Sequence, residues 1–197
     1  EADHSLSGAG GWGWRLWNAL FMSVSSRTAG FNTLPMAGMS GAGILILVFL
    51  MIVGASPGST GGGLKTTTFG LMLLSTLRHL GRRHRVVYRG HSIPSDNVLV
   101  ALTLTILYGL VLLTGALLLG RTEAFPFRSV LFEAASAIGT VGLSLGITPG
   151  FSEVGKVILI VMMFLGRVGI LTFAIGFSGR RPEADNVSYA ETHISIG

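Results

Sequence analysis

The feature that most restricts this chain is an uncharged stretch of about 23 residues, Val98–Gly120. At a rise of about 1.5 Å per residue, a helix of that length exceeds the roughly 30 Å hydrocarbon core of a bilayer. The whole chain is 49% hydrophobic and 12% charged, and a typical soluble domain carries about twice that share of charge. Cysteine is absent, which excludes disulfides and thiolate metal sites. We therefore expect an all-α integral membrane protein.

Two further apolar stretches are candidates for crossing the bilayer, although neither is as clean. Val154–Phe177 is long enough, but it carries Arg167 in its middle. Gly41–Val53 is too short, and it continues into Leu64–Leu77 only after a break rich in Gly, Ser and Thr. We interpret the two shorter pieces as one broken spanning element.

Two helix-like segments, Trp12–Val24 and Pro126–Ala137, are too short to cross a bilayer. Each is followed by a small turn that contains glycine, Arg27–Phe31 in the first case and Gly139–Leu143 in the second. Irregular backbone at membrane depth is tolerated only where protein or a water-filled path surrounds it. A short helix, a glycine turn and a return to the same side are therefore typical of a re-entrant pore segment.

These segments form an internal repeat. The offset between the copies is 111 at the phenylalanines (132 − 21) and 112 at the turn threonines (140 − 28), so the second copy carries one inserted residue. A spanning helix precedes the short helix in the second copy, whereas the chain begins too late for one in the first. We therefore predict helix–pore loop–helix repeats, of which about one and three-quarters are present.

Basic residues set the expected orientation. Five arginines lie between Arg78 and Arg89, and Arg180 and Arg181 follow the last apolar stretch. The positive-inside rule places both groups in the cytoplasm and both glycine turns on the outer side. Residues 81–96 then form a basic cytoplasmic loop suited to lipid head groups or a cytosolic partner. The loop lacks an aromatic platform, so we expect no nucleic-acid partner.

The glycine turns have the residue types of a cation filter. A cation that crosses a bilayer exchanges its water shell for oxygens, and backbone carbonyls supply a dipole without a charge that would trap the ion. Glycine suits such a segment because it reaches positive φ without strain. Thr140–Gly142 has the Thr-Val-Gly sequence of potassium-channel filters, and Thr28–Gly30 is a relaxed version. Ordinary glycine turns share these residues, so packing alone is the alternative.

Three motifs, in this order, resemble the potassium-transporter superfamily that includes Trk, Ktr and HKT proteins. They are Ser26–Asn32, Gly54–Thr68 and Leu165–Gly169. The resemblance covers nearly the whole chain and is closest to the C-terminal half of a bacterial Trk/Ktr membrane subunit. It implies a potassium-channel-like transporter with four repeats around one pore. By this resemblance residues 1–80 hold the third repeat without its first spanning helix, residues 97–179 the fourth repeat, and residues 180–197 a cytoplasmic tail.

The resemblance also implies the activity and the residues that perform it. The whole protein takes up K⁺, with Na⁺ as an additional cation, and this chain binds no cofactor. The filter binds K⁺ through the backbone carbonyls of two turns, which comprise Thr28, Ala29, Gly30, Phe31, Thr140, Val141, Gly142 and Leu143. The gate combines an intramembrane loop with a pore-facing arginine, and its residues are Gly58, Ser59, Thr60, Gly61, Gly62, Gly63, Lys65 and Arg167.

The resemblance further implies a setting and partners. The protein crosses the bacterial inner (cytoplasmic) membrane several times, among membrane lipids. Its partners are the N-terminal half of the same protein, a second copy in a homodimer, and cytosolic nucleotide-binding regulatory subunits. The competing class is a non-conducting membrane scaffold or assembly module, in which the glycines serve close helix contact.

Some residues leave their roles open. Residues 58–66 are similar to a phosphate-binding P-loop, but Leu64 stands where that motif requires lysine. Arg167, which is costly at mid-bilayer, either latches the closed gate or satisfies carbonyls of a broken helix. Glu133 either adds negative potential to the ion path or pairs with Arg27 or Arg128.

Two further basic residues, Arg27 and Lys65, are expected near the filter and the gate loop. Arg27 is expected to brace the outer mouth of the filter, and Lys65 to cap the far end of the gate loop or reach cytoplasmic water. No carboxylate pair and no nucleophile–base arrangement is visible in the sequence, so we do not expect an enzyme.

Overall fold

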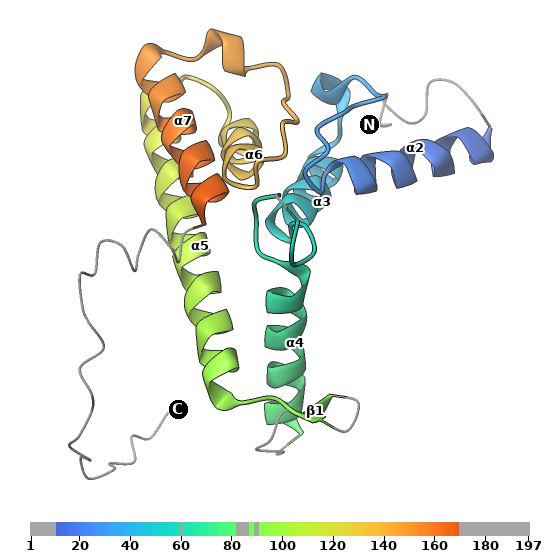
Figure 1. The fold of residues 1–197 in the computed structure, drawn as a ribbon. Coiled ribbons are helices and arrows are strands. Elements are labelled where there is room, and N and C mark those ends of the chain that lie inside the picture. Colours follow the sequence, from blue (N-terminus) through green and yellow to red (C-terminus); the bar gives the residue numbers. More distant parts are fainter. Residues whose placement is uncertain (1–10, 60, 82–86, 89–90, 170–197) are drawn as a thin grey trace.

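The structure, a computed structural model, describes residues 11–59, 61–81, 87–88 and 91–169. Most of this part is α-helical (Figure 1). The helices are α2 (Trp12–Ser25), α3 (Gly41–Ile52), α4 (Thr66–Leu80), α5 (Ser95–Thr122), α6 (Phe127–Ile138) and α7 (Glu153–Val168). The shorter elements are the 3₁₀ helices η1 (Met36–Gly38) and η2 (Thr148–Gly150), and the strands β1 (Val87–Tyr88) and β2 (His91–Ser92). The two strands pair antiparallel, with Val87 opposite Ser92.

Helix α5 contains the uncharged stretch and is, in the described part, the helix long and apolar enough to cross a membrane. Its 28 residues correspond to about 42 Å. Its most apolar 18-residue window has a mean hydropathy of 2.3, and 22% of that window is buried. The large apolar side chains along its open face are Leu99, Ile106, Leu110, Leu113 and Leu117. A helix that leaves this much apolar surface uncovered suits contact with lipid.

The predicted interruption of the other spanning element is present. Helix α3 ends at Ile52 and α4 begins at Thr66, so the Gly/Ser/Thr-rich segment between them is not helical. Helix α7 begins at Glu153 and ends at Val168, and the remaining residues of the predicted span, 170–177, lie outside the described residues.

Local sequence accounts for where these helices begin. Ser40 and Ser152 occupy the N-cap positions of α3 and α7, and each hydroxyl accepts a hydrogen bond of 3.1 Å from the backbone N–H three residues later. Pro94 and Pro126 stand immediately before α5 and α6, where each ring disfavours a helical conformation for the residue that precedes it.

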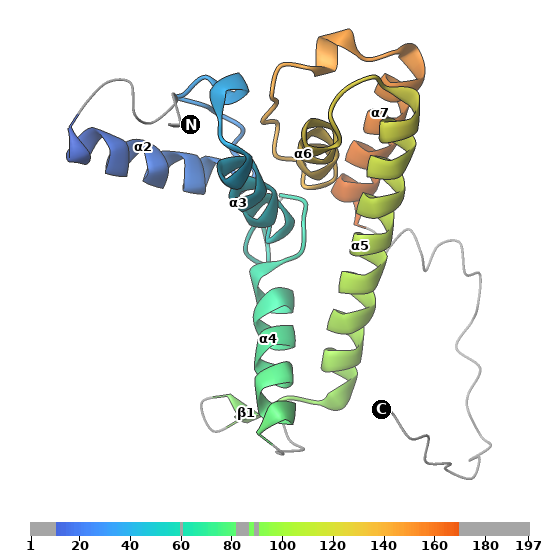
Figure 2. The same ribbon diagram turned by 180° about the vertical axis from the view of Figure 1, so that it is seen from behind.

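The short helix α6 lies at the centre of the packing. It contacts α3, α5 and α7, and Phe132 and Ile138 are fully buried. Helix α2, in contrast, extends sideways from the other helices in both views (Figures 1 and 2) and leaves Trp12 and Trp17 exposed.

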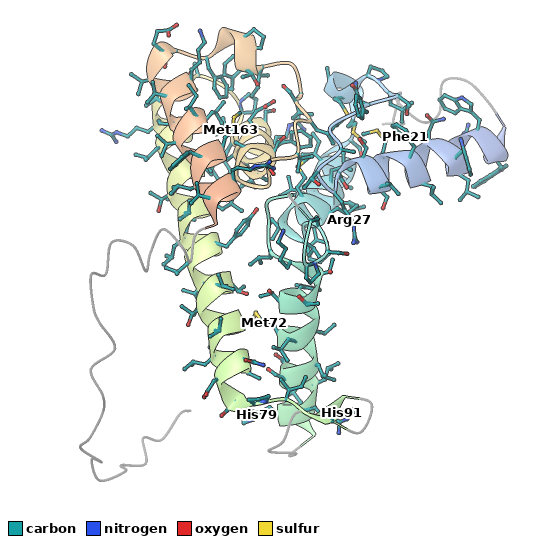
Figure 3. All side chains as sticks on the ribbon, in the orientation of Figure 1. Phe21, Arg27, Met72, His79, His91 and Met163 are labelled. Atoms are coloured by element: carbon teal, nitrogen blue, oxygen red, sulfur yellow. The ribbon has the colours of Figure 1, made fainter. Side chains whose placement is uncertain are left out.

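The strand pair and the two 3₁₀ helices lie at opposite ends of the molecule. Helix α4 packs against α5, and both reach the strand pair at one end of the molecule, beside His79 and His91 (Figure 3). Both glycine turns lead toward η1 and η2, which lie at the opposite end (Figure 1). Residues 87–88 and 91–92, which lie within the predicted cytoplasmic loop, are therefore at the opposite end from the exits of the two turns.

Candidate ion pathway

The two glycine turns share an unusual backbone. Thr28 and Thr140 have positive φ angles of 74° and 51°, and no other non-glycine residue in the described part of the chain does. Two residues later, Gly30 and Gly142 have φ angles of 76° and 90°. A left-handed conformation costs a threonine roughly 1–2 kcal/mol, so the surroundings must hold each turn in place. Left-handed residues at alternate positions turn successive carbonyls toward one side, as a cation filter requires.

Both turns close onto an equivalent serine at the end of the preceding helix. The Ala29 N–H donates to the Ser25 carbonyl at 3.1 Å, and the Val141 N–H donates to the Ser136 carbonyl at 2.9 Å. The two serines differ by 111 (136 − 25), whereas the two donors differ by 112 (141 − 29). The inserted residue of the second copy therefore lies between the serine and the turn. In the first copy the Gly30 N–H also donates to the Ser25 carbonyl at 3.1 Å, so both copies contain a hydrogen bond that spans five residues.

The two turns lie directly against each other. A methyl group added at Gly30 would collide with the Val141 carbonyl oxygen, and one added at Gly142 would lie 3.6 Å from the Gly30 Cα. Segments more than a hundred residues apart thus meet backbone to backbone. Glycine is required at position 30 both for its positive φ and because no Cβ fits between the turns.

The loop between α3 and α4 touches both turns at their threonines. The Gly62 N–H donates a hydrogen bond of 2.8 Å to the Thr140 hydroxyl. Gly61 lies against Thr28, where an added Cβ would be 2.6 Å from the hydroxyl oxygen and 2.7 Å from the methyl group. An added Cβ at Gly62 would lie 2.8 Å from the Thr140 hydroxyl oxygen. Gly61 thus contacts the first repeat and Gly62 the second. The loop therefore lies across the end of each turn that is nearer to its preceding helix.

This loop is closed at its own base. The Gly54 N–H donates to the Leu64 carbonyl at 2.8 Å, and the Leu64 N–H donates to the Ile52 carbonyl at 3.0 Å. Gly54 and Gly63 pack so tightly that a Cβ on Gly63 would lie 2.9 Å from the Gly54 Cα. Lys65, the residue before α4, donates from Nζ to the Ser59 carbonyl at 3.1 Å and to the Gly61 carbonyl at 2.6 Å. Of the two roles expected for Lys65, the structure shows the contact with the loop. Thr60 lies outside the described residues.

A cavity of about 730 Å³ opens beside the second turn. Its lining includes Thr140, Gly142, Glu133 and Arg167. Met163 also lines it and lies between α7 and α6 (Figure 3). One cavity thus joins a filter turn, a carboxylate and the arginine predicted to face the pore.

Arg167 reaches this cavity because the residue before it has no side chain. A Cβ on Gly166 would overlap the Ile138 carbonyl at the end of α6, so glycine allows α7 to approach α6 and brings Arg167 near the turn. Sequence reasoning missed this role of Gly166, which adjoins a charge expected within an apolar span.

The structure rules out one of the two alternatives for Glu133 and the expected place of Arg27. Within the described part, Glu133 pairs with neither Arg27 nor Arg128, because its carboxylate accepts hydrogen bonds from Ser144, Leu145 and Thr148. Arg27 does not brace the outer mouth either. It directly precedes Thr28, which touches the gate loop, and it lies at the level of that loop, at the end of α2 (Figure 3).

No side-chain metal site accompanies the turns. In the ranges that the structure describes, no group of three or more His, Cys, Asp or Glu side chains is arranged to hold a metal ion. Backbone carbonyls of the turns are therefore the candidate cation ligands here. The serine pair Ser25 and Ser136 also went unrecognised from the sequence, although the offset of 111 relates them.

Fold and site together define a helical protein suited to a membrane, in which two equivalent glycine turns meet, and the comparison with known proteins gives its family. The family described as cation transport protein, TrkH, matches residues 11–189. The chain belongs to this family, which is one of transporters and not of enzymes, and the predicted membership of the Trk/Ktr superfamily is confirmed.

Several similar proteins are named for potassium uptake or potassium transport. The Ktr system potassium uptake protein B of Bacillus subtilis is 38% identical over 184 residues, covering 93% of this chain and 41% of the relative. The potassium/sodium uptake protein NtpJ of Enterococcus hirae is 40% identical over 189 residues, covering 93% and 42%. The crystal structure of the potassium transporter TrkH from Vibrio parahaemolyticus matches with a TM-score of 0.77 and 27% identity, covering 90% of this chain and 39% of that one. The chain thus spans about two fifths of their length.

Proposed function

We propose that this chain is part of a transporter that takes up K⁺, and Na⁺ as an additional cation, through a filter of backbone carbonyls. The observation that carries the proposal is the contact between two turns with the same alternating positive φ, Thr28–Phe31 and Thr140–Leu143. Such turns hold peptide oxygens at one place, where they replace the hydration shell of a cation. Relatives named for potassium uptake and for potassium/sodium uptake support this choice of ions.

The proposed gate is loop 54–65 together with Arg167. The loop contacts both turn threonines, so in this position it obstructs the inner end of the filter. Its glycines present little bulk, which lets it move aside at low steric cost. Arg167 lines the cavity beside the second turn, where its permanent positive charge repels a passing cation.

The complete transporter needs more than this chain. Two repeats supply half of the filter, and the N-terminal half of the same protein supplies the rest. That half would also cover the exposed side of α2, on which Trp12, Leu16 and Trp17 are uncovered. A homodimer in the bacterial inner membrane, crossing it several times and resting on cytosolic nucleotide-binding regulatory subunits, completes the proposal.

The decisive experiment measures uptake of K⁺ and Rb⁺ by cells that lack their own uptake systems and express the complete parent protein. We expect growth at low K⁺ and saturable Rb⁺ uptake. Replacing Gly142 with Ser is expected to lower the preference for K⁺ over Na⁺, because a side chain there disturbs the left-handed turn. Unchanged selectivity in G142S at normal expression would remove the filter assignment.

The gate has its own test. Arg167→Ala is expected to raise flux, because the positive charge beside the turn is lost, and Arg121→Ala, near the end of α5, serves as the matched control. A fall in flux with normal assembly would argue against the latch. A non-conducting scaffold predicts no uptake by the wild-type protein at all.

A further inference from the structure

Glu133 is a buried carboxylate whose contacts all lie beyond the filter turn. It sits on α6 and is 5% exposed. Its Oε1 accepts hydrogen bonds of 2.8 Å from both the Ser144 hydroxyl and the Leu145 N–H. Its Oε2 accepts a hydrogen bond of 2.9 Å from the Thr148 hydroxyl. A buried carboxylate is costly unless donors surround it, and this one has three.

The donors belong to one short segment. Residues 144–148 directly follow Leu143, the last residue of the second turn, and lead into η2. Within this segment the Gly146 N–H donates to the Ser144 hydroxyl oxygen at 2.9 Å. The hydroxyl oxygens of Ser144 and Thr148 lie 3.2 Å apart. Glu133 therefore fastens the outer limb of the second turn (residues 144–148) to the helix that precedes the turn.

The first copy holds its limb differently. At the offset of 111, Glu133 corresponds to Met22 (133 − 111), which has no polar group to offer. Instead, the Thr33 hydroxyl donates to the Asn18 amide oxygen at 2.7 Å, across 15 residues. The contact from Glu133 to Thr148 also spans 15 residues. In both copies the short helix is tied to a threonine after the turn, but only the second copy uses a carboxylate.

This geometry has a consequence for selectivity. Thr140–Gly142 is anchored on its helix side by the Ser136 carbonyl, and Glu133 anchors the limb on its other side. A turn fixed at both ends keeps its carbonyls at a set spacing, whereas a turn with one loose end can close around a smaller ion. Groups that orient direct ligands in this way usually matter about 10- to 100-fold for metal affinity or activity.

We propose that Glu133 is a positioning residue for the filter: by holding residues 144–148 it sets the preference of the second turn for K⁺ over Na⁺. This inference rests on the proposed function. Glu133 acts by positioning residues 144–148 and not by attracting the ion with its charge. Its carboxylate oxygens are occupied by hydroxyl and N–H donors of the limb, which is the arrangement expected of a brace.

The test uses the complete parent protein and compares Glu133→Gln with Glu133→Ala. Glutamine keeps an acceptor oxygen for Ser144 and Leu145, and its amide can donate to the Thr148 hydroxyl oxygen, so the brace survives without the charge. We expect E133A to lower the ratio of K⁺ to Na⁺ uptake about tenfold, and E133Q to retain most of it. Equal losses in the two variants would overturn the inference in favour of an electrostatic role.

Matched variants keep the result interpretable. Glu123→Gln alters a similarly buried carboxylate, which directly follows α5 and accepts hydrogen bonds from Ser152, and is expected to leave the uptake ratio unchanged. Thr148→Val removes one donor with little change of shape, so it tests the brace even where E133A does not assemble, and we expect a smaller fall in the ratio. An unchanged ratio in T148V, or in a well-assembled E133A, would overturn the proposal. If T148V or E133A leaves the ratio unchanged but G142S lowers it in the same assay, the role proposed for Glu133 is wrong and the filter assignment still holds.

Discussion

Replacing Gly62 with alanine tests the gate most directly. The added methyl group would lie 2.8 Å from the Thr140 hydroxyl oxygen and 2.9 Å from the Gly139 carbonyl oxygen, well inside ordinary contact distance. Overpacking of this kind costs about 1–3 kcal/mol. The strain exists while the loop lies against the turn and disappears when the loop moves away. The mutation should therefore shift the equilibrium between closed and open forms about 5- to 150-fold toward the open form.

The assay is Rb⁺ influx into uptake-deficient cells that express the complete parent protein, without any stimulus that opens the transporter. We expect Gly62→Ala to raise this basal influx. Gly70→Ala is the matched control, because position 70 lies in α4 with nothing within 4 Å of the added methyl group, and its influx should equal that of the wild type. Influx in G62A at or below the control, with equal protein in the membrane, would refute the reasoning.

Three further predictions concern stability, measured as thermal unfolding of the complete protein in detergent. Gly166→Ala should destabilise the protein by about 1–3 kcal/mol, because the added Cβ would overlap the Ile138 carbonyl. Gly109→Ala is the control, since its added Cβ has open space, and it should not destabilise. Equal melting temperatures for the two variants would contradict the close approach of α7 and α6. Tyr108→Phe should leave stability unchanged or raise it, since the buried hydroxyl has no hydrogen-bond partner in the described structure, and a clear loss would reveal a partner. Hydrogen bonds from the Ser152 hydroxyl and N–H lower the pKa of Glu123 in the folded protein. The ionised Glu123 therefore adds its full contribution to the free energy of unfolding above the unfolded pKa of about 4.3. This contribution is lost as the pH falls through the lower pKa of the folded state. Glu123→Gln should abolish this loss of stability at low pH and should leave the melting temperature constant between neutral pH and pH 5. If the variant loses stability at low pH as the wild type does, the assignment is wrong.

Much of the fold could be predicted from the sequence because a bilayer imposes simple requirements. The absence of charge over Val98–Gly120 predicts the spanning part of α5, and the lengths of the two short segments predict that α2 and α6 cannot cross. The break between α3 and α4 follows from residues that are poor in a helix interior. Each of these features depends on properties of one segment alone.

The details of the site depend on contacts between segments, and there the sequence was a weaker guide. Opposite charge suggests Arg27 or Arg128 as a partner for Glu133, but the actual donors are hydroxyls and an N–H that lie 11 to 15 residues later. The sequence places Arg27 just after α2, but it does not show that this end of α2 lies at the level of the loop. The contact of Gly61 and Gly62 with the turn threonines has no sequence signal apart from the glycines themselves.

The lysine that ends the gate loop has a mechanical consequence. Lys65 is both the residue from which α4 starts and the group that grips the carbonyls of Ser59 and Gly61. Helix α4 has 15 residues and is about 22 Å long, and its far end lies beside the strand pair. A small tilt or rotation imposed at that end would be carried along the helix and would pull directly on the tip of the loop, without any rearrangement of α6 or α7.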